Sequence, residues 1–393
     1  MGALDAFLPI VGRLAAEPWK GSVDLVIMNR AVDAIVLSSR LHSEIFARHA
    51  NIVRLEVGSG SPKGILSSVR KAARLTWLLL RRRLTHRRLI VLTALVGDGR
   101  RERLLLRLFD LVGTHFFFPS NQMPATAEFS RRLASDAWTV LMSQGAKKRV
   151  APKIAVRRAI RYTPSEVALA RPGFAARTQF FPIGVPRLYP GWPEFISRTA
   201  EASLETELRQ RGLDPKCREI AVLVVPAPEY FWFDDPRGCY RLIDDVIGRI
   251  RGHLPKLPIL IKAKPQHAER FRGALPAGDS NIVTTIGLAA LATRARFAVG
   301  IQETSGIFDF LALEVPVIEY GRYSQAWLRV CPSGSAYRDF PGVTHVETVD
   351  ALDSAVAAAK AGTLPRPSRL ALGQLLQDQD RFDQLLGEAA ISA

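Results

Sequence analysis

Cysteine is scarce in this chain, and its three residues, Cys217, Cys239 and Cys331, stand far apart. They form no CxxC pair, which argues against a disulfide framework and against a structural zinc site. Long apolar runs are absent as well, since no uninterrupted run approaches the roughly 18 to 20 residues that cross a bilayer. These absences predict a protein of a reducing compartment that does not span a membrane.

The first residues lack the features of a targeting signal. The opening sequence MGALDAFLPIVGRLAAEPW carries an acidic Asp5 and has no basic segment ahead of its apolar residues. It therefore predicts an amphipathic helix rather than a signal peptide. Ala6 stands where a myristoylation signal needs serine or threonine. We expect a cytoplasmic protein.

Positive charge and apolar residues are plentiful. The chain has 393 residues, of which 48% are apolar and 23% charged, and its net charge is +17. This length predicts two globular domains of about 150 to 200 residues each. The charge surplus predicts an anionic partner, and composition leaves lipid headgroups, phosphorylated substrates and nucleic acid open.

Short apolar runs alternate with longer amphipathic stretches along most of the chain. VDLVIMN, IVRLEV and RLIVLTALV are examples in the first half, and EIAVLVVPAP, FAVGI and VPVIEYG in the second. Such alternation predicts βαβ units and parallel sheets, hence an α/β fold. We expect an acceptor-side α/β domain at 1–190, a connection at 191–215, a nucleotide-sugar-binding α/β domain at 216–367, and a helix at 368–393 that packs back across the domains.

A polar segment follows the predicted strand FAVGI and precedes the helical run IFDFLALE. It consists of Gln302, Glu303, Thr304, Ser305 and Gly306. A hydroxyl pair on such a turn can cap the helix and also leave backbone N–H groups for an anion such as a diphosphate. A hydroxyl that only caps the helix is the equally open alternative.

Cations and a histidine end an earlier predicted strand. ILIKAKPQHAERF places Lys262, Lys264 and His267 at the carboxyl end of that strand, where they could face the same phosphates. Taken alone, the lysines fit surface charge on an edge strand, and the histidine fits a solvated loop.

Together these segments resemble the C-terminal domain of bacterial glycosyltransferases of the GT-B fold. The family pattern joins a strand ending in K-x-H-P to a later strand followed by two serines, a helix acid and P-V-I. Here the equivalents read KAKPQH and QETSGIFDFLALEVPVIEYG, and FFPIGVPRLYPGW resembles the G-x-P-(K/R) segment before the crossover. The related proteins include capsule and surface-polysaccharide glycosyltransferases, CDP-glycerol glycerophosphotransferases and the UDP-N-acetylglucosamine 2-epimerase fold.

The resemblance implies two Rossmann-like domains that face each other across a cleft, and a sugar or sugar-like phosphate unit moved from a nucleotide donor to a surface polysaccharide or lipid-linked acceptor. It implies no cofactor beyond the nucleotide-sugar co-substrate and no metal. By it, the donor nucleotide would be bound by Lys262, Lys264, His267, Gln302, Glu303, Thr304, Ser305, Gly306 and Asp309.

Asp98, at the end of a predicted strand, is the candidate general base for an acceptor hydroxyl, although a turn acid or helix cap is the alternative. His115 is a further loop candidate. The loop GSGSPKG matches neither the G-x-G-x-x-G pattern nor the P-loop spacing. It therefore gives little support to the alternative that the protein is a nicotinamide oxidoreductase.

The stretch from Trp77 to Arg88 combines leucines with five arginines. It is typical of a helix in contact with an anionic membrane, and equally of a core helix with a solvated basic end. No nucleic-acid-binding signature accompanies the charge, so we expect no nucleic acid. A nucleotide-sugar epimerase and a non-catalytic carbohydrate or nucleic-acid binding protein remain as alternative functions.

Overall fold

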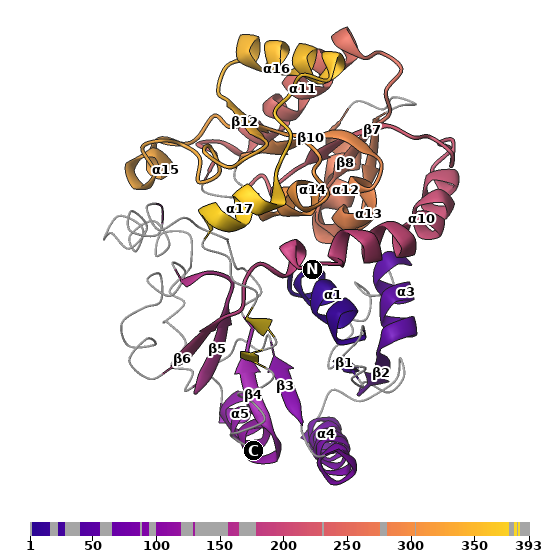
Figure 1. The fold of residues 1–393 in the computed structure, drawn as a ribbon, viewed down its shortest axis with the longest axis vertical. Coiled ribbons are helices and arrows are strands. Elements are labelled where there is room, and N and C mark those ends of the chain that lie inside the picture. Colours follow the sequence, from indigo (N-terminus) through magenta and orange to yellow (C-terminus); the bar gives the residue numbers. More distant parts are fainter. Residues whose placement is uncertain are drawn as a thin grey trace.

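The computed structural model describes most of the chain (Figure 1). The described residues are 2–15, 23–27, 40–55, 65–86, 89–93, 100–118, 129, 156–164, 178–229, 232–275, 281–302, 304–376, 381–382 and 384–385. They form an N-terminal part that ends with strand β6 and a C-terminal part that begins with strand β7, and both parts are built on parallel strands. The predicted α/β class and the organisation in two Rossmann-like parts are therefore confirmed.

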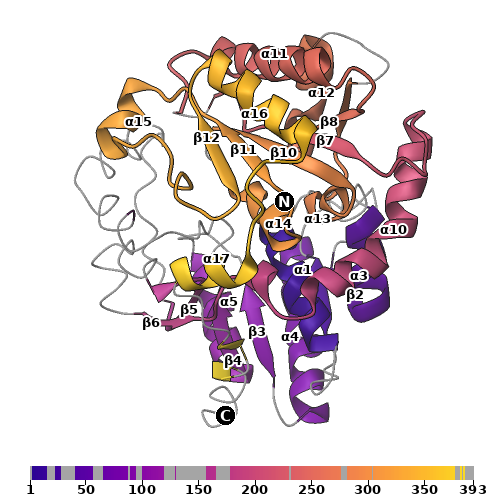
Figure 2. The ribbon, with the colours of Figure 1, turned by 45° about the horizontal axis from the view of Figure 1, so that its top comes forward.

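The C-terminal part contains a six-stranded parallel sheet (Figure 2). In space its strands follow the order β12-β11-β10-β7-β8-β9, so the chain moves outward from β7 in one direction, returns to β10 and moves outward in the other. This is the doubly wound order of Rossmann-type domains. The strands are β7 (Ile220–Val224), β8 (Ile259–Lys262), β9 (Asn281–Thr284), β10 (Ala295–Ile301), β11 (Val317–Tyr320) and β12 (Val343–Val346).

Helices cover both faces of this sheet, which explains why its strands are almost continuously apolar. One face carries α11 (Pro236–His253), α12 (Pro265–Ala274) and α16 (Val349–Ala361), whose buried side chains form one core cluster with the sheet. The other face carries α13 (Leu288–Ala292), the 3₁₀ turn η2 (Ser305–Ile307) and α14 (Phe308–Ala312). A short helix, α15 (Gln325–Val330), follows β11.

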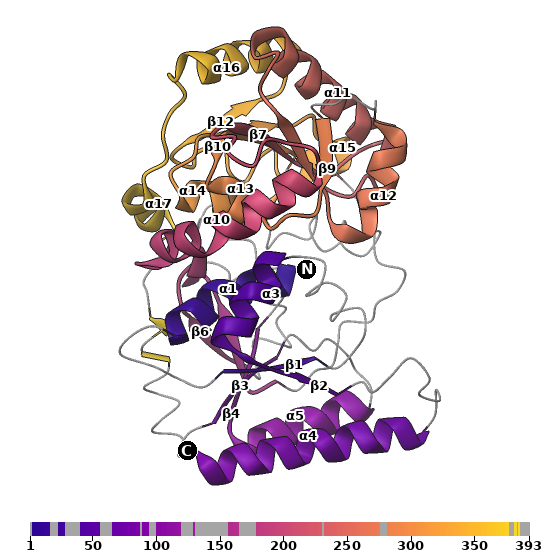
Figure 3. The same cartoon turned by 90° about the vertical axis from the view of Figure 1, so that its right-hand side faces the viewer.

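The N-terminal part holds two parallel sheets among its described residues. Strands β1 (Asp24–Ile27) and β2 (Asn51–Arg54) form one, and β3 (Ile90–Thr93), β4 (Thr114–Phe117), β5 (Arg158–Arg161) and β6 (Gln179–Pro182) form the other. Helices α4 (Ile65–Thr85) and α5 (Arg100–Val112) lie side by side on one outer face (Figure 3). Helices α1 (Gly2–Ala15) and α3 (Arg40–His49) lie towards the C-terminal part.

The two parts share one continuous buried cluster. Helix α10 (Trp192–Gln210) packs against α1 and α3 on one side and against α13 on the other. The predicted amphipathic helix at the start is confirmed, because α1 contributes Leu8, Ile10 and Val11 to this cluster. The 3₁₀ turn η1 (Pro186–Leu188) contacts both α1 and α14, and α17 (Arg369–Leu375) begins at its Ser368 cap. The domain boundaries proposed from the sequence remain predictions.

One prediction about strand placement is wrong. One alternative drawn from the sequence placed Lys262 on an edge strand. In the structure its strand, β8, pairs with β7 on one side and with β9 on the other. A helix that the sequence pattern missed, α12, follows directly, and Pro265 opens it. Proline suits the first helical position because its missing N–H would have no partner there.

Candidate functional site

The carboxyl edge of the C-terminal sheet is the natural place for a site. Because all its strands run parallel, the loops that follow them gather at this edge. The strand order reverses between β7 and β10, and crevices at such reversals are where open α/β sheets bind ligands. The predicted segment 302–306 follows β10 directly, so it lies at the reversal.

Gln302 joins the loop after β10 to the loop after β11. Its backbone has a φ of 57°, in the left-handed region that favours glycine, and its side chain is fully buried. The amide Nε2 donates to the carbonyl oxygen of Arg322 at 2.8 Å. Among the described residues, its Oε1 is buried without a hydrogen-bond partner. The structure thus assigns Gln302 a positioning contact between two loops of the edge.

Thr304 and Ser305 begin the helical turn that follows. Thr304 adopts extended backbone, and its hydroxyl accepts from the N–H of Gly306 at 3.4 Å, which is a long capping bond. Ser305 is exposed at the first position of the turn. The N–H of Ile307 donates to the carbonyl oxygen of Thr304 at 3.3 Å. Both open interpretations, capping and anion binding, are compatible with this geometry, since the first N–H groups of a helical turn have no partner within the helix.

Gly306 has a steric reason to be glycine. A Cβ at this position would lie 2.8 Å from Cδ1 of Leu288 and 3.0 Å from Cγ1 of Val224. The turn therefore packs directly against α13 and the end of β7. This close packing fixes the position of the Thr304–Ser305 backbone relative to the strand reversal.

Asp309, predicted to bind the donor, forms a buried ion pair. Nε of Arg187 lies 2.9 Å from Oδ1 of Asp309, and the two side chains are 10% and 5% exposed. Arg187 belongs to η1, the turn that leads from the N-terminal part towards α10. Asp309 therefore joins the C-terminal part to the segment that connects the two parts.

The cationic residues at β8 differ in their surroundings. Lys262 is buried, and its Nζ donates to the carbonyl oxygen of Thr285 at 2.9 Å, which ties β8 to the loop after β9. Lys264 is exposed at the cap position of α12. His267 lies in the first turn of α12, where burial and the nearby Lys264 lower its pKa, so the ring is neutral at pH 7. Lys264 and His267 stand at the same edge as Thr304 and Ser305.

Two predicted residues lie outside the described residues: Asp98, the candidate base, and Glu303. His115 was wrongly interpreted as a loop residue. It lies in β4, where its Nε2 is 2.9 Å from Oγ1 of Thr93 and its ring is 1% exposed. A buried histidine with a hydroxyl partner is a core residue.

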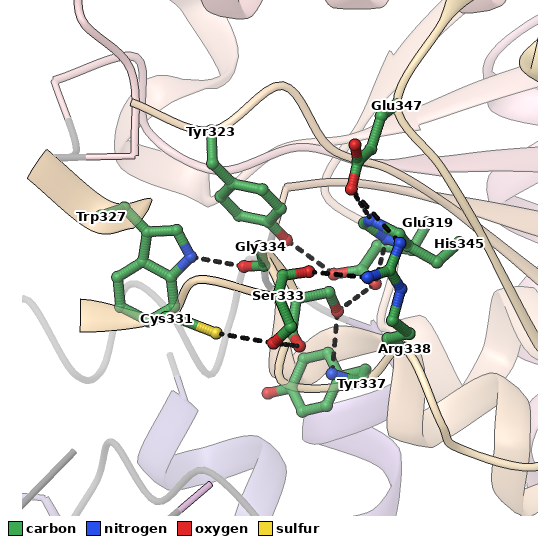
Figure 4. Close-up of polar contacts among 11 residues, drawn as sticks. Glu319, Tyr323, Trp327, Cys331, Ser333, Gly334, Tyr337, Arg338, His345 and Glu347 are labelled. Carbon is green, nitrogen blue, oxygen red and sulfur yellow. Dashed lines mark hydrogen bonds and ion pairs between the residues drawn. The ribbon is translucent and has the colours of Figure 1, made fainter. Parts of the chain in front are cut away.

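A buried carboxylate that sequence reasoning missed lies at the end of β11 (Figure 4). Glu319 is fully buried. Its Oε1 accepts from the hydroxyl of Tyr323 at 2.8 Å, and Oε2 accepts from the hydroxyl of Ser335. Nδ1 of His345 lies 3.1 Å from Oε2. These three contacts satisfy a charge that would otherwise be very costly to bury.

His345 links this carboxylate to a second one. Its Nε2 lies 3.0 Å from Oε1 of Glu347, so the ring stands between two carboxylates. Burial lowers the pKa of His345, but hydrogen bonds and charge attraction from Glu319 and Glu347 outweigh it, and the net pKa is raised. The sequence signal was a glutamate inside the apolar strand VPVIEYG, where an unpaired charge is not expected.

A cavity of about 590 Å³ opens next to this cluster. Its walls come from the start of α11, the end of β11 and the end of β12. The segment before α11 is joined to the segment after β11 by a backbone hydrogen bond of 2.9 Å from the N–H of Ser324 to the carbonyl oxygen of Trp232. The lining residues include the aromatic Phe233 and Tyr323, the acidic Asp234, Asp235 and Glu347, and the basic Arg241 and Arg322.

This volume and this mixture of rings and charged groups are usual for a small-molecule site. Carboxylates and guanidinium groups suit hydroxyl-rich or phosphorylated ligands, and aromatic rings suit the apolar faces of sugars. Within the described part of the chain, no group of three or more histidine, cysteine, aspartate or glutamate residues is arranged to hold a metal ion.

No protein-family model and no curated protein sequence matches the chain. Solved structures of glycosyltransferases are similar over nearly the whole length. The glycotransferase of kitacinnamycin has 14% identity and a TM-score of 0.46, with 99% of this chain and 96% of that chain covered. Phytolacca americana UGT2, complexed with UDP-2-fluoro-glucose and pterostilbene, has 10% identity and a TM-score of 0.48, with 100% and 97% covered. The spinosyn forosaminyltransferase SpnP has 13% identity and a TM-score of 0.45, with 99% and 97% covered.

Proposed function

We propose that the chain is a glycosyltransferase of GT-B type, with its nucleotide-sugar donor at the carboxyl edge of the C-terminal sheet. The observation that carries this proposal is the position of Thr304 and Ser305 directly after β10, at the reversal of the strand order. The sequence resemblance of KAKPQH and QETSGIFDFLALEVPVIEYG to such enzymes supports the same edge independently.

The donor diphosphate would lie against the turn that begins at Thr304. Backbone N–H groups and the exposed hydroxyl of Ser305 can donate to phosphate oxygens. Lys264, exposed at the end of β8, supplies a cation at the same edge, and the neutral ring of His267 can donate or accept a hydrogen bond. Neutralising the leaving diphosphate in this way is the reason we propose a metal-independent reaction.

The cavity beside Tyr323 would receive the hydroxyl-rich part of a substrate. Gln302 joins the loop of the proposed phosphate site to Arg322, a residue that lines the cavity. Asp234, Asp235 and Glu347 are acceptors for sugar hydroxyls. Phosphate site and cavity would then hold two ends of one bound substrate.

The acceptor in this proposal is a bacterial surface polysaccharide or a lipid-linked glycan. Its support is the resemblance in sequence to capsule and surface-polysaccharide enzymes. A transferase needs such an acceptor before it releases the nucleotide, whereas an epimerase of the same fold does not. Nucleotide release measured with and without an acceptor glycan therefore separates these two functions.

The first experiment is a thermal-shift screen against UDP, CMP, CDP, GDP and NAD. A ligand that binds only the folded protein raises its melting temperature. We expect one nucleotide other than NAD to stabilise the wild type and to lose this effect in the variant Thr304→Ala/Ser305→Ala. The matched control, Ser354→Ala/Thr363→Ala, removes two exposed hydroxyls at α16 and should keep the full shift.

Stabilisation by NAD alone would contradict the proposal, and so would a nucleotide shift that both double variants retain. The latter would move the phosphate site away from Thr304 and Ser305.

A further inference from the structure

Helices α4 and α5 present one common surface to solvent, which we call the outer helical face. Both pack their inner sides on the same face of the N-terminal sheets, through Leu75 and Leu79 of α4 and Leu106, Phe109 and Val112 of α5. They lie next to each other at the end of the molecule remote from the C-terminal sheet (Figures 1 and 3). The outer helical face consists of Arg70, Arg74, Trp77, Leu80, Arg81, Leu84, Leu104, Arg107 and Leu111.

The spacing of these residues is helical. In α4 the exposed positions 70, 74, 77, 81 and 84 follow each other at three or four residues, opposite the buried Leu75 and Leu79. In α5 the exposed positions 104, 107 and 111 do the same. Each helix therefore has apolar residues on two sides. The rest of the protein covers only one of these two sides.

The outer helical face gathers the large apolar side chains that the protein leaves in water. Among the described residues, six such side chains are exposed, and five of them lie on α4 and α5. Leu84 and Leu111 are 87% and 82% exposed, and Trp77 is 61% exposed. Single exposed leucines are ordinary, but a cluster on one face marks an interaction surface.

The charged members of the outer helical face are all arginines. The sequence of α4 contains no aspartate or glutamate. Arg70, Arg74, Arg81 and Arg107 are exposed among the leucines, and the guanidinium of Arg81 lies 5.3 Å from the ring centre of Trp77. Arg82, in contrast, points inward and holds Asp24 through Nη2 at 2.7 Å, so it belongs to the fold rather than to the face.

We propose that the outer helical face docks on an anionic lipid bilayer. Leucine and tryptophan side chains would enter the region between headgroups and acyl chains, and the arginines would meet lipid phosphates. A nucleic acid would match the arginines but would leave the exposed leucines in water, because its outer surface is a charged backbone. This inference does not depend on the proposed sugar transfer.

The test is flotation of the full chain with vesicles. We expect binding to mixed phosphatidylcholine–phosphatidylglycerol vesicles and little binding to phosphatidylcholine alone. Leu84→Ser/Leu111→Ser should weaken binding about tenfold or more, because two apolar side chains no longer leave water. Arg74→Gln/Arg107→Gln should weaken it about fivefold for each arginine at low salt.

Matched controls change the same chemistry elsewhere. Leu370→Ser removes an exposed leucine on α17, and Arg209→Gln/Arg218→Gln removes two exposed arginines near the end of α10. We expect both controls to bind vesicles as the wild type does, and all variants to keep the wild-type melting temperature, since every substituted side chain is exposed.

Three results would overturn the proposal. The first is the absence of preference for anionic vesicles, and the second is an equal loss of binding in the controls. The third is binding to a DNA duplex that Arg74→Gln/Arg107→Gln weakens while Leu84→Ser/Leu111→Ser has no effect on either partner; that pattern would identify a nucleic-acid surface.

Discussion

Arg187 and Asp309, 122 residues apart in the sequence, form a buried ion pair with 2.9 Å between Nε and Oδ1. The arginine lies in the segment GVPRL that resembles the family's crossover motif, and the aspartate lies in the helix after β10. Two segments that the sequence linked only by resemblance are thus in direct contact. The pair connects the segment between the two parts to the helix that follows the proposed donor site.

Breaking this pair should destabilise the fold. Removal of one partner breaks a buried ion pair, which costs about 3 to 5 kcal/mol. We therefore expect Arg187→Met and Asp309→Leu each to lower the free energy of unfolding by that amount in urea titrations. The double variant should regain most of the loss, because two well-packed apolar side chains often replace a buried pair without cost. A double variant as unstable as the sum of the singles would contradict this interpretation.

The outline of the fold was accessible from the sequence because apolar strands buried on both sides leave a clear pattern. IAVLV and ARFAVGI show it in β7 and β10. Helix α12 was missed because PQHAERFRGA is short and mostly polar. The order of the strands was not accessible either, since pairings such as Val299 with Leu223 join residues far apart in the sequence.

The candidate site was accessible only in part. Thr304 and Ser305 stand after an obvious strand, so a loop at the sheet edge could be predicted. The roles of Lys262 and Gln302 could not, because both depend on a carbonyl oxygen of another loop, Thr285 and Arg322 respectively. Glu319 and His345 come together only because β11 and β12 pair with these two residues in register.

Gly306 should tolerate no larger residue without cost. The added methyl group of Gly306→Ala would press on Leu288 and Val224, and overpacking of this kind costs about 1 to 3 kcal/mol. Gly248→Ala is the matched control, since a Cβ there meets nothing within 4 Å and the residue lies inside α11. That control should gain about 0.5 to 1 kcal/mol. Equal effects of both substitutions on the unfolding free energy would show that Gly306 is not tightly packed.

His115 should make the protein sensitive to acid. Burial, with a smaller effect from Arg158, lowers its pKa from 6.5 to about 4. The unfolded chain binds a proton at this histidine below pH 6.5, whereas the folded protein resists protonation, so stability falls as pH drops from 6.5 towards 4. The difference in pKa corresponds to about 3 kcal/mol over this range.

The variant His115→Gln keeps a hydrogen-bonding partner for Thr93 but does not titrate. We expect its unfolding free energy to fall less than that of the wild type across the same pH range. Oδ1 of Asp110 lies 3.9 Å from Nδ1 of His115, and burial raises the pKa of this carboxyl group. Its protonation therefore increases the stability of both proteins as pH falls, which opposes the effect of His115. Parallel pH profiles of variant and wild type would show that His115 is not the group responsible.

His345 should produce the opposite pH dependence. Its burial opposes protonation, but Glu319 and Glu347 hold the proton, and the folded-state pKa is raised above 6.5. The folded protein therefore binds this proton more tightly than the unfolded chain does. The resulting stabilisation is fully present below pH 6.5 and is lost as pH rises through the folded-state pKa. In His345→Gln this loss should disappear, which urea titrations from acidic to alkaline pH can measure.

Glu347→Gln, at the exposed end of the cluster, should reduce the loss without abolishing it, because Glu319 remains in contact with the ring. A wild-type profile that stays flat above pH 6.5 would contradict the raised pKa of His345.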